Sequence, residues 1–223
     1  MNPRIIDLTL TIEEGMQTFP TPWHPYVEIT QLGRHGIENR ETRKLVLGTH
    51  TGTHMDAPRH FIRRGATVDA IPLEQLVGTA TVVNFATLPD HTPITPAMLL
   101  QAVGELPWER LALRFDWDRH LGTNRYYTDH PFLEEETARL LLEKKCLLLA
   151  MDTPQPDNPQ NGRGTPKDSP IHKILLGNGV ILVEYLIGLA GVRGNPVQLV
   201  VAPLKIRDGD GAPVRCFVIE TPG

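Results

Sequence analysis

Short runs of β-branched and aliphatic residues recur along the chain and predict a strand-rich protein. Several of these runs are apolar throughout, which is typical of strands that are buried on both faces of a sheet. The predicted strands cover residues 5–11, 26–32, 44–50, 79–85, 111–115, 146–152, 180–186, 197–203 and 214–220.

Fewer segments have the periodicity of helices. Thr95 followed by Pro96 resembles an N-cap with proline at the first helical position, ahead of the run AMLLQAV. Residues 132–145 begin with glutamates and end with two lysines, a polarity that suits the helix dipole. Segments 69–77 and 170–177 are shorter candidates. This mix predicts an α/β or α+β protein, with a mixed β core and flanking helices in a single domain over 1–223.

Two polar stretches are predicted to be long loops. Residues 116–131 are polar and aromatic, and residues 153–170 contain five prolines. Loops of this length in a compact domain are often lids or binding loops. Disorder is the alternative for 153–170.

Composition narrows the class of protein. The chain has 223 residues, a formal net charge of -4 and no long run of one charge sign, so the basic footprint of a nucleic-acid-binding protein is missing. No stretch approaches the roughly 18 apolar residues of a membrane span. The N-terminus has acidic residues where a signal peptide is apolar. Cys146 and Cys216 lie in apolar runs, as buried free thiols do. A cytoplasmic protein that binds neither nucleic acid nor membrane is expected.

The densest chemistry lies in HTGTHMDAPRHF, residues 50–61, which holds three of the nine histidines. In a flat strand His50 and His54 would lie about 13 Å apart, too far to share one ion, but Gly52 offers a bend between them. Two imidazoles and the Asp56 carboxylate are ligands that Zn, Mn or Fe accept. Three protein ligands would leave a position for water, as in catalytic sites. The segment therefore predicts a catalytic metal site.

Residues outside this triad extend the prediction. His60 follows Asp56 by four residues and is either a further ligand or a general acid/base, since imidazoles titrate near neutral pH. Glu184 lies inside the apolar run VILVEYL, where a carboxylate is costly to bury unpaired. A metal or a hydrogen-bond network would explain it, unless an edge strand leaves it in water. Asp152 ends another apolar run, either as an acceptor for a ligand histidine or as a strand-end carboxylate.

Other chemistries have weaker signals. The segment 162–169 lacks the spacing of a phosphate-binding loop. DGDG at 208–211 lacks the glutamate of a calcium loop and is typical of a tight turn between strands. No G-x-S-x-G motif is present, and neither cysteine has a histidine nearby in sequence, which disfavours a serine or cysteine nucleophile.

HTGTHMDAPRHF resembles the H-x-G-T-H-x-D-x-P-x-H-F signature of the cyclase family, the kynurenine formamidase-like and isatin hydrolase-like metal-dependent hydrolases. The segments IIDLTLTIEEGMQTFP, LLLAMDTPQPD and HKILLGNGVILVEYL are also similar to family segments. The resemblance covers nearly the whole chain. It implies a swivelling β/β/α-type fold, in dimers or tetramers with active sites near subunit interfaces.

The resemblance also implies roles for individual residues. The residues that match the family's metal ligands are His50, His54, Asp56, His172 and Glu184. Asp56 would bridge two ions in dinuclear members, and His60 matches the catalytic acid/base. Phe19 and Trp23 are the aromatic candidates for contact with substrate, and Trp117, Tyr126 and Tyr127 are further aromatic residues that could line a pocket.

The implied activity is hydrolysis of a non-peptide C–N bond in a small amide, such as an aryl formamide, a lactam or a cyclic imide. The implied cofactor is one or two divalent ions, Zn or Mn, which lower the pKa of bound water while His60 supplies a proton to the leaving nitrogen. An arylformamidase-like enzyme is thus expected. Two alternatives stay open: a metal-dependent lyase or dehydratase, and a non-catalytic metal- or ligand-binding protein of the same fold.

Overall fold

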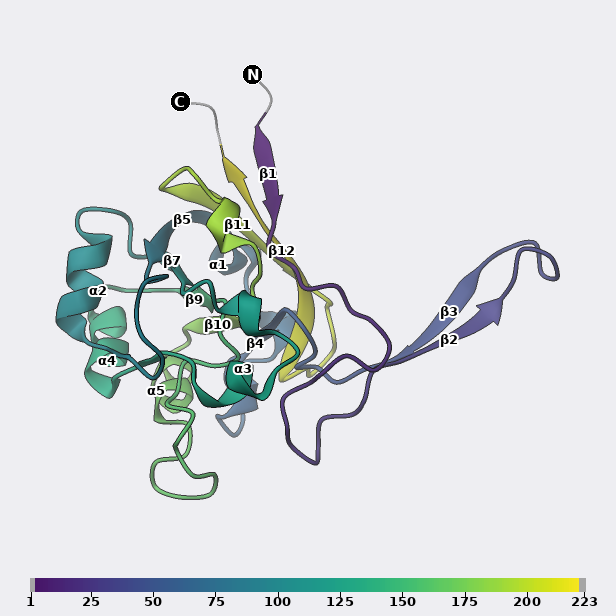
Figure 1. The fold of residues 1–223 in the computed structure, drawn as a ribbon, viewed down its shortest axis with the longest axis horizontal. Coiled ribbons are helices and arrows are strands. Elements are labelled where there is room, and N and C mark those ends of the chain that lie inside the picture. The colour runs from purple at the N-terminus through teal and green to yellow at the C-terminus, as the bar shows by residue number, and fades with distance from the viewer. Residues whose placement is uncertain (1–2, 221–223) are drawn as a thin grey trace.

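In the computed structural model of the chain, which describes residues 3–220, eight strands form one mixed sheet (Figure 1). The sheet order is β1-β12-β11-β5-β7-β9-β10-β4, and β12 also pairs with β4. That second pairing closes seven of the strands into a ring and leaves β1 outside it. The strands are β1 (Arg4–Asp7), β4 (His54–Asp56), β5 (Val77–Asn84), β7 (Arg110–Arg114), β9 (Leu148–Met151), β10 (Ile181–Glu184), β11 (Val197–Pro203) and β12 (Gly211–Glu220).

The parallel strands β5, β7, β9 and β10 are covered on both faces. On β7, Leu111 and Leu113 belong to one apolar cluster and Ala112 to the other. The first cluster includes residues of the outer helices α2 (Pro96–Val103), α4 (Glu135–Glu143) and α5 (Pro170–Gly177), which lie together on one side of the sheet in Figure 1. The expected mixed β core with flanking helices is confirmed.

The predicted helices are present, but two of them are shorter than the sequence indicates. The Thr95 hydroxyl accepts a hydrogen bond from the Met98 backbone N–H at 3.3 Å, which makes Thr95 the predicted N-cap of α2. Helix α4 begins at Glu135 rather than residue 132, because β8 (Phe132–Leu133) pairs with β6 (Pro93–Ile94). Within 69–77 the α-helix is confined to α1 (Leu73–Leu76).

The segment 116–131 is more ordered than a loop prediction implies. It contains a 3₁₀ turn and α3 (Asn124–Thr128), and the Trp117 and Tyr126 side chains are buried in the core. The Trp117 indole N–H donates to the Tyr126 carbonyl at 3.0 Å. Asp152 accepts hydrogen bonds from the backbone N–H groups of Phe115 and Trp117, so it anchors this segment and is not an acceptor for a ligand histidine.

The strands β2 (Glu28–Gly33) and β3 (Thr42–Val46) form a separate hairpin that projects away from the body of the protein (Figure 1). Both were expected from apolar runs, yet most of their residues are exposed. Both cysteines are free and buried, as predicted. No helix within residues 3–220 is long and apolar enough to span a membrane.

Candidate metal centre

The sheet brings the two halves of the site together. Strand β4 pairs antiparallel with β10, and His54 lies directly opposite Glu184 in that register. Before β4, Gly52 adopts a positive φ of 59°, and the His50 and His54 rings come within 5.0 Å of each other. The bend predicted at Gly52 is therefore present. Because β10 lies between β9 and β4, Glu184 is not on an edge strand and is only 4% exposed.

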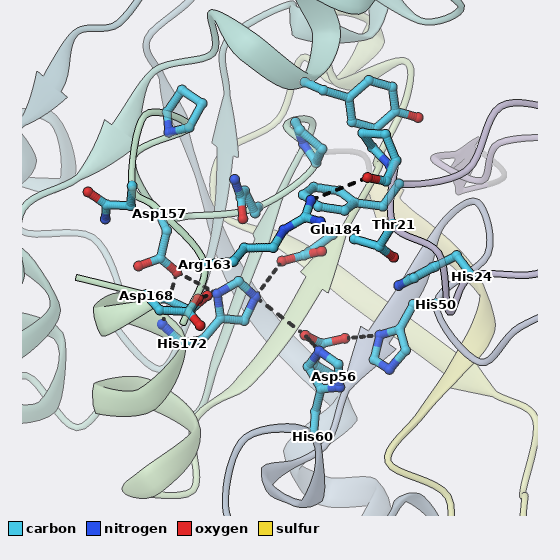
Figure 2. Close-up of a pocket in the computed structure, with 18 of the residues that line it drawn as sticks. Thr21, His24, His50, Asp56, His60, Asp157, Arg163, Asp168, His172 and Glu184 are labelled. Atoms are coloured by element: carbon cyan, nitrogen blue, oxygen red, sulfur yellow. Dashed lines mark hydrogen bonds and ion pairs between the residues drawn. The ribbon is translucent and has the colours of Figure 1, made fainter. Parts of the chain in front are cut away.

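The five predicted ligands form one cluster with Asp56 at its centre, and Figure 2 labels Asp56, His50, His172 and Glu184. His50 Nδ1 lies 2.7 Å from Asp56 Oδ1, and His54 Nε2 lies 3.4 Å from the same oxygen. His172 Nε2 lies 3.5 Å from Asp56 Oδ2 and 3.1 Å from Glu184 Oε1. His54 Nε2 is also 3.5 Å from Glu184 Oε2. All five side chains are buried or nearly so.

Hydrogen bonds at Nδ1 fix the orientation of two of these imidazole rings. His54 Nδ1 donates to the Gly52 carbonyl at 2.8 Å, and His172 Nδ1 donates to Asp157 Oδ2 at 2.5 Å. Both rings, held in this way, direct Nε2 toward the carboxylates. Burial opposes the charged form of His172, but its hydrogen bonds to Asp157, Asp56 and Glu184 raise its pKa well above the usual range. Asp56 Oδ1 is buried without a hydrogen-bond partner among residues 3–220, since His50 Nδ1 is close but out of line. The Nε2 atoms and carboxylate oxygens that face one another here are the donor types that a divalent cation binds. The donor set therefore fits a metal ion.

The charges of the site favour a cation as well. Burial disfavours the charged form of His50, but the Asp56 charge and the hydrogen bond to Asp210 raise its pKa to about 10. Burial likewise opposes ionisation of Asp56, yet the charges of His50 and His60 hold its pKa well below the usual range. The cluster attracts positive charge, whether as protons or as metal ions.

His60 lies at the edge of the cluster, on a 3₁₀ turn over Pro58–His60. Its Nε2 is 4.0 Å from Asp56 Oδ2, and its side chain is 25% exposed. Donor atoms of His50, Asp56 and His60 all lie within 4.8 Å of one another, as do those of His54, Asp56 and Glu184. Asp56 thus belongs to both groups, which is what one bridged pair of ions or a single shared ion requires.

Two carboxylates of the site were missed in the sequence. Asp210 Oδ2 lies 2.9 Å from His50 Nε2 and 3.2 Å from His60 Nδ1. Hydrogen bonds from these two histidines hold the pKa of Asp210 far below its usual range. Asp157 is the acceptor for His172 described above. The DGDG segment does form a turn between β11 and β12, as predicted, but nothing in its linear pattern indicates a histidine partner.

The cluster opens into a cavity of about 550 Å³, a size typical of small-molecule sites. Phe19, Trp23 and Tyr127 line it, together with His24 and Arg163. Burial and the charge of His50 lower the pKa of His24 to about 4, so this ring is neutral. Residues of both predicted loops contribute to the wall, but of the aromatic residues in 116–131 only Tyr127 does so; Trp117 and Tyr126 lie in the core.

Comparisons with known proteins find relatives that match nearly the whole chain. A kynurenine formamidase from Salinibacter ruber is 32% identical over 98% of both chains. The solved structure of isatin hydrolase A from Labrenzia aggregata, bound to benzyl benzoate, is 26% identical, covers 99% of this chain and 94% of its own, and superposes with a TM-score of 0.88. A predicted metal-dependent hydrolase from Bacillus stearothermophilus is 25% identical, with a TM-score of 0.79, over 99% of this chain and all of its own.

The family model described as putative cyclase matches residues 6–158. That range includes β4, the turn that carries His60 and Asp157, while Glu184 and His172 follow it in the sequence. From this match and the full-length similarity to the curated relative, the chain belongs to the cyclase family.

Proposed function

We propose that this chain is a metal-dependent hydrolase that cleaves the C–N bond of a small aryl formamide, lactam or cyclic imide. One observation carries the proposal: His60 lies beside a buried cluster of imidazoles and carboxylates that opens into a small-molecule cavity. The similarity to a kynurenine formamidase and to isatin hydrolase A supports this class of substrate. One catalytic domain over residues 1–223 is proposed to hold the whole site.

The proposed ligands of the metal are His50, His54, Asp56, His172 and Glu184. Zn and Mn both suit this donor set, in one or two positions that share Asp56. A divalent ion here would supply Lewis acidity to the amide carbonyl and to water. The protein's own contribution is to hold the Nε2 atoms of His54 and His172 toward the carboxylates, through Gly52 and Asp157.

His60 is the proposed acid/base. The Asp210 carboxylate accepts from His60 Nδ1, which leaves Nε2 directed toward Asp56 and the cavity. From there Nε2 holds a proton that it gives to the departing nitrogen, which is a poor leaving group as an anion. Phe19 and Trp23 line the same cavity and are proposed to contact the apolar part of the substrate.

We further propose that the protein assembles as a homodimer or homotetramer in the cytoplasm. The β2–β3 hairpin supports assembly, because it exposes Leu32, Ile37 and Leu45 away from the body of the protein. A two-stranded hairpin alone is marginally stable in water, so contact with a second copy would stabilise it. Light scattering coupled to size exclusion would give the mass of the assembly.

The first experiment is metal analysis of protein purified without chelator, followed by a panel of aryl formamides, isatin and cyclic imides with mass detection of products. One or two equivalents of Zn or Mn and products that gain one water are expected. Products without added water would instead identify a lyase. Tight metal binding with no turnover on any substrate would leave a metal-binding protein of the same fold.

A further inference from the structure

Arg163 places a permanent positive charge at the mouth of the cavity. Of the residues that line the cavity within the described part of the chain, it is the one lysine or arginine. It comes from the proline-rich loop that follows β9, and Figure 2 shows its side chain reaching across the pocket toward the segment that carries Thr21. The remaining charged side chains of the wall are carboxylates and histidines of the metal cluster and its surroundings.

Aromatic rings hold the guanidinium of Arg163 in place. Its central carbon lies 5.3 Å from the centre of the Phe19 ring and 5.7 Å from that of Trp23. Its Nη2 donates a long hydrogen bond of 3.4 Å to the Pro20 carbonyl. Contacts of this kind orient a guanidinium without neutralising its charge, because an aromatic face carries no net charge.

The nearby carboxylates are already engaged elsewhere. Asp168 accepts from the Gly164 backbone N–H at 2.8 Å and from the Ser169 hydroxyl at 2.9 Å. Asp157 is bonded to His172 and to the first turn of α5. Within residues 3–220 no carboxylate oxygen lies within 4.0 Å of an Arg163 nitrogen. No direct ion pair therefore occupies the guanidinium, although its charge helps to lower the pKa of Asp168, after the hydrogen bonds from Gly164 and Ser169.

We propose that Arg163 forms an anion subsite at the cavity mouth, and that the preferred substrate is an amide whose end remote from the scissile bond carries a carboxylate. The inference rests on the proposed function, because both use the same cavity. A guanidinium presents paired N–H donors whose spacing matches a carboxylate, and its restraint by Phe19 and Trp23 lowers the entropic cost of binding. The aryl part of such a substrate would then lie between the subsite and the metal cluster.

The test compares two substrates that differ in one charge, 4-formamidobenzoate and formanilide. R163Q removes the charge, R163K keeps it without the paired donors, and K167Q removes a like charge from the same loop outside the cavity wall. For 4-formamidobenzoate we expect R163Q to lower kcat/KM about tenfold through KM, as loss of a charged hydrogen bond does, with R163K intermediate. Formanilide should change less than about twofold, and K167Q should leave both substrates near wild type.

The anion subsite would be overturned if R163Q lowered kcat/KM equally for both substrates, or lowered it for neither. A second measurement separates this outcome from failure of the proposed function: binding of 4-aminobenzoate and aniline by titration calorimetry to the purified protein and its variants. The subsite is supported, even where no amide is hydrolysed, if R163Q binds 4-aminobenzoate more weakly than wild type does and binds aniline as wild type does. Unchanged affinity would mean that the carboxylate binds elsewhere, for example at the metal, and would overturn it.

Discussion

Asp157 Oδ2 lies 2.5 Å from Nδ1 of His172, and both side chains are buried. The same carboxylate accepts from the backbone N–H groups of Ile171 and His172, in the first turn of α5. One group therefore fixes both the start of the helix and the ring that the helix presents to Asp56 and Glu184. An imidazole that donates to a carboxylate is a more basic ligand with a defined orientation.

Asp157→Asn should weaken the metal site. The amide is a poorer acceptor for His172 Nδ1, so we expect metal affinity to fall about 10- to 100-fold. Titration with Zn or Mn against a competing chelator measures the change. Asp90→Asn, which alters a surface ion pair with Arg125, is the matched control. Wild-type affinity in Asp157→Asn would remove this carboxylate from the metal site.

The sequence predicted the parts of the site that are local in the chain. His50, His54 and Asp56 lie within seven residues, and the bend at Gly52 is a local backbone property. Apolar runs likewise indicate the buried strands β7, β9 and β10, because a strand that is buried on both faces is apolar at nearly every position.

The pairing of strands that are distant in the chain, and its register, could not be predicted from the sequence. His54 meets Glu184 only because β4 pairs with β10, and Asp210 reaches His50 because β12 pairs with β4 on the other side. These pairings join segments more than 100 residues apart, and packing of the whole sheet decides them. For the same reason the sequence of 116–131 predicts a loop although Trp117 and Tyr126 are buried, since their partners lie elsewhere in the core.

Asp56→Asn should lower metal occupancy sharply. Asp56 contacts His50, His54 and His172, and a neutral amide in its place removes the one anion that both ligand groups share. Elemental analysis of the purified variant should give far less than one equivalent per chain. Asp7→Asn, which alters a surface ion pair with Arg215, controls for loss of a carboxylate. Full occupancy of the Asp56 variant would contradict the proposed ligand set.

His60→Ala separates catalysis from metal binding. The side chain is partly exposed and lies at the edge of the cluster, so we expect metal content near wild type and turnover lower by about 100-fold or more. His35→Ala, on the exposed tip of the hairpin, provides the control for removal of a histidine. A large loss of metal in His60→Ala would show that His60 is a ligand instead, and unchanged turnover would remove it from the mechanism.

Gly211→Ala should disturb His50 by direct contact. A Cβ at this position would lie 2.6 Å from His50 Cε1 and 2.9 Å from the Met55 carbonyl oxygen, closer than such atoms approach. Either the ring or the pairing of β12 with β4 has to shift, so we expect lower metal affinity and lower activity. Gly36→Ala meets no atom within 4 Å and is the control. Wild-type metal affinity in Gly211→Ala would show that the strands adjust without moving His50.

Asp152 makes the free energy of unfolding of the protein depend on pH. Burial raises the pKa of its carboxyl to about 8, although hydrogen bonds from the Phe115 and Trp117 backbones oppose the rise. Because the folded pKa exceeds the unfolded value of about 3.8, the folded state favours the protonated group. That contribution is complete below pH 4 and is lost as the pH rises through 8.

Asp152→Asn removes the titrating group and keeps an oxygen that accepts from the same two N–H groups. The free energy of unfolding of the variant, minus that of wild type, should therefore increase between pH 5 and pH 9, by on the order of a few kcal/mol. Urea denaturation of both proteins across this range measures the difference, and every other titrating group cancels in the subtraction. A difference that does not change with pH would mean that Asp152 ionises as readily in the folded chain as in the unfolded one.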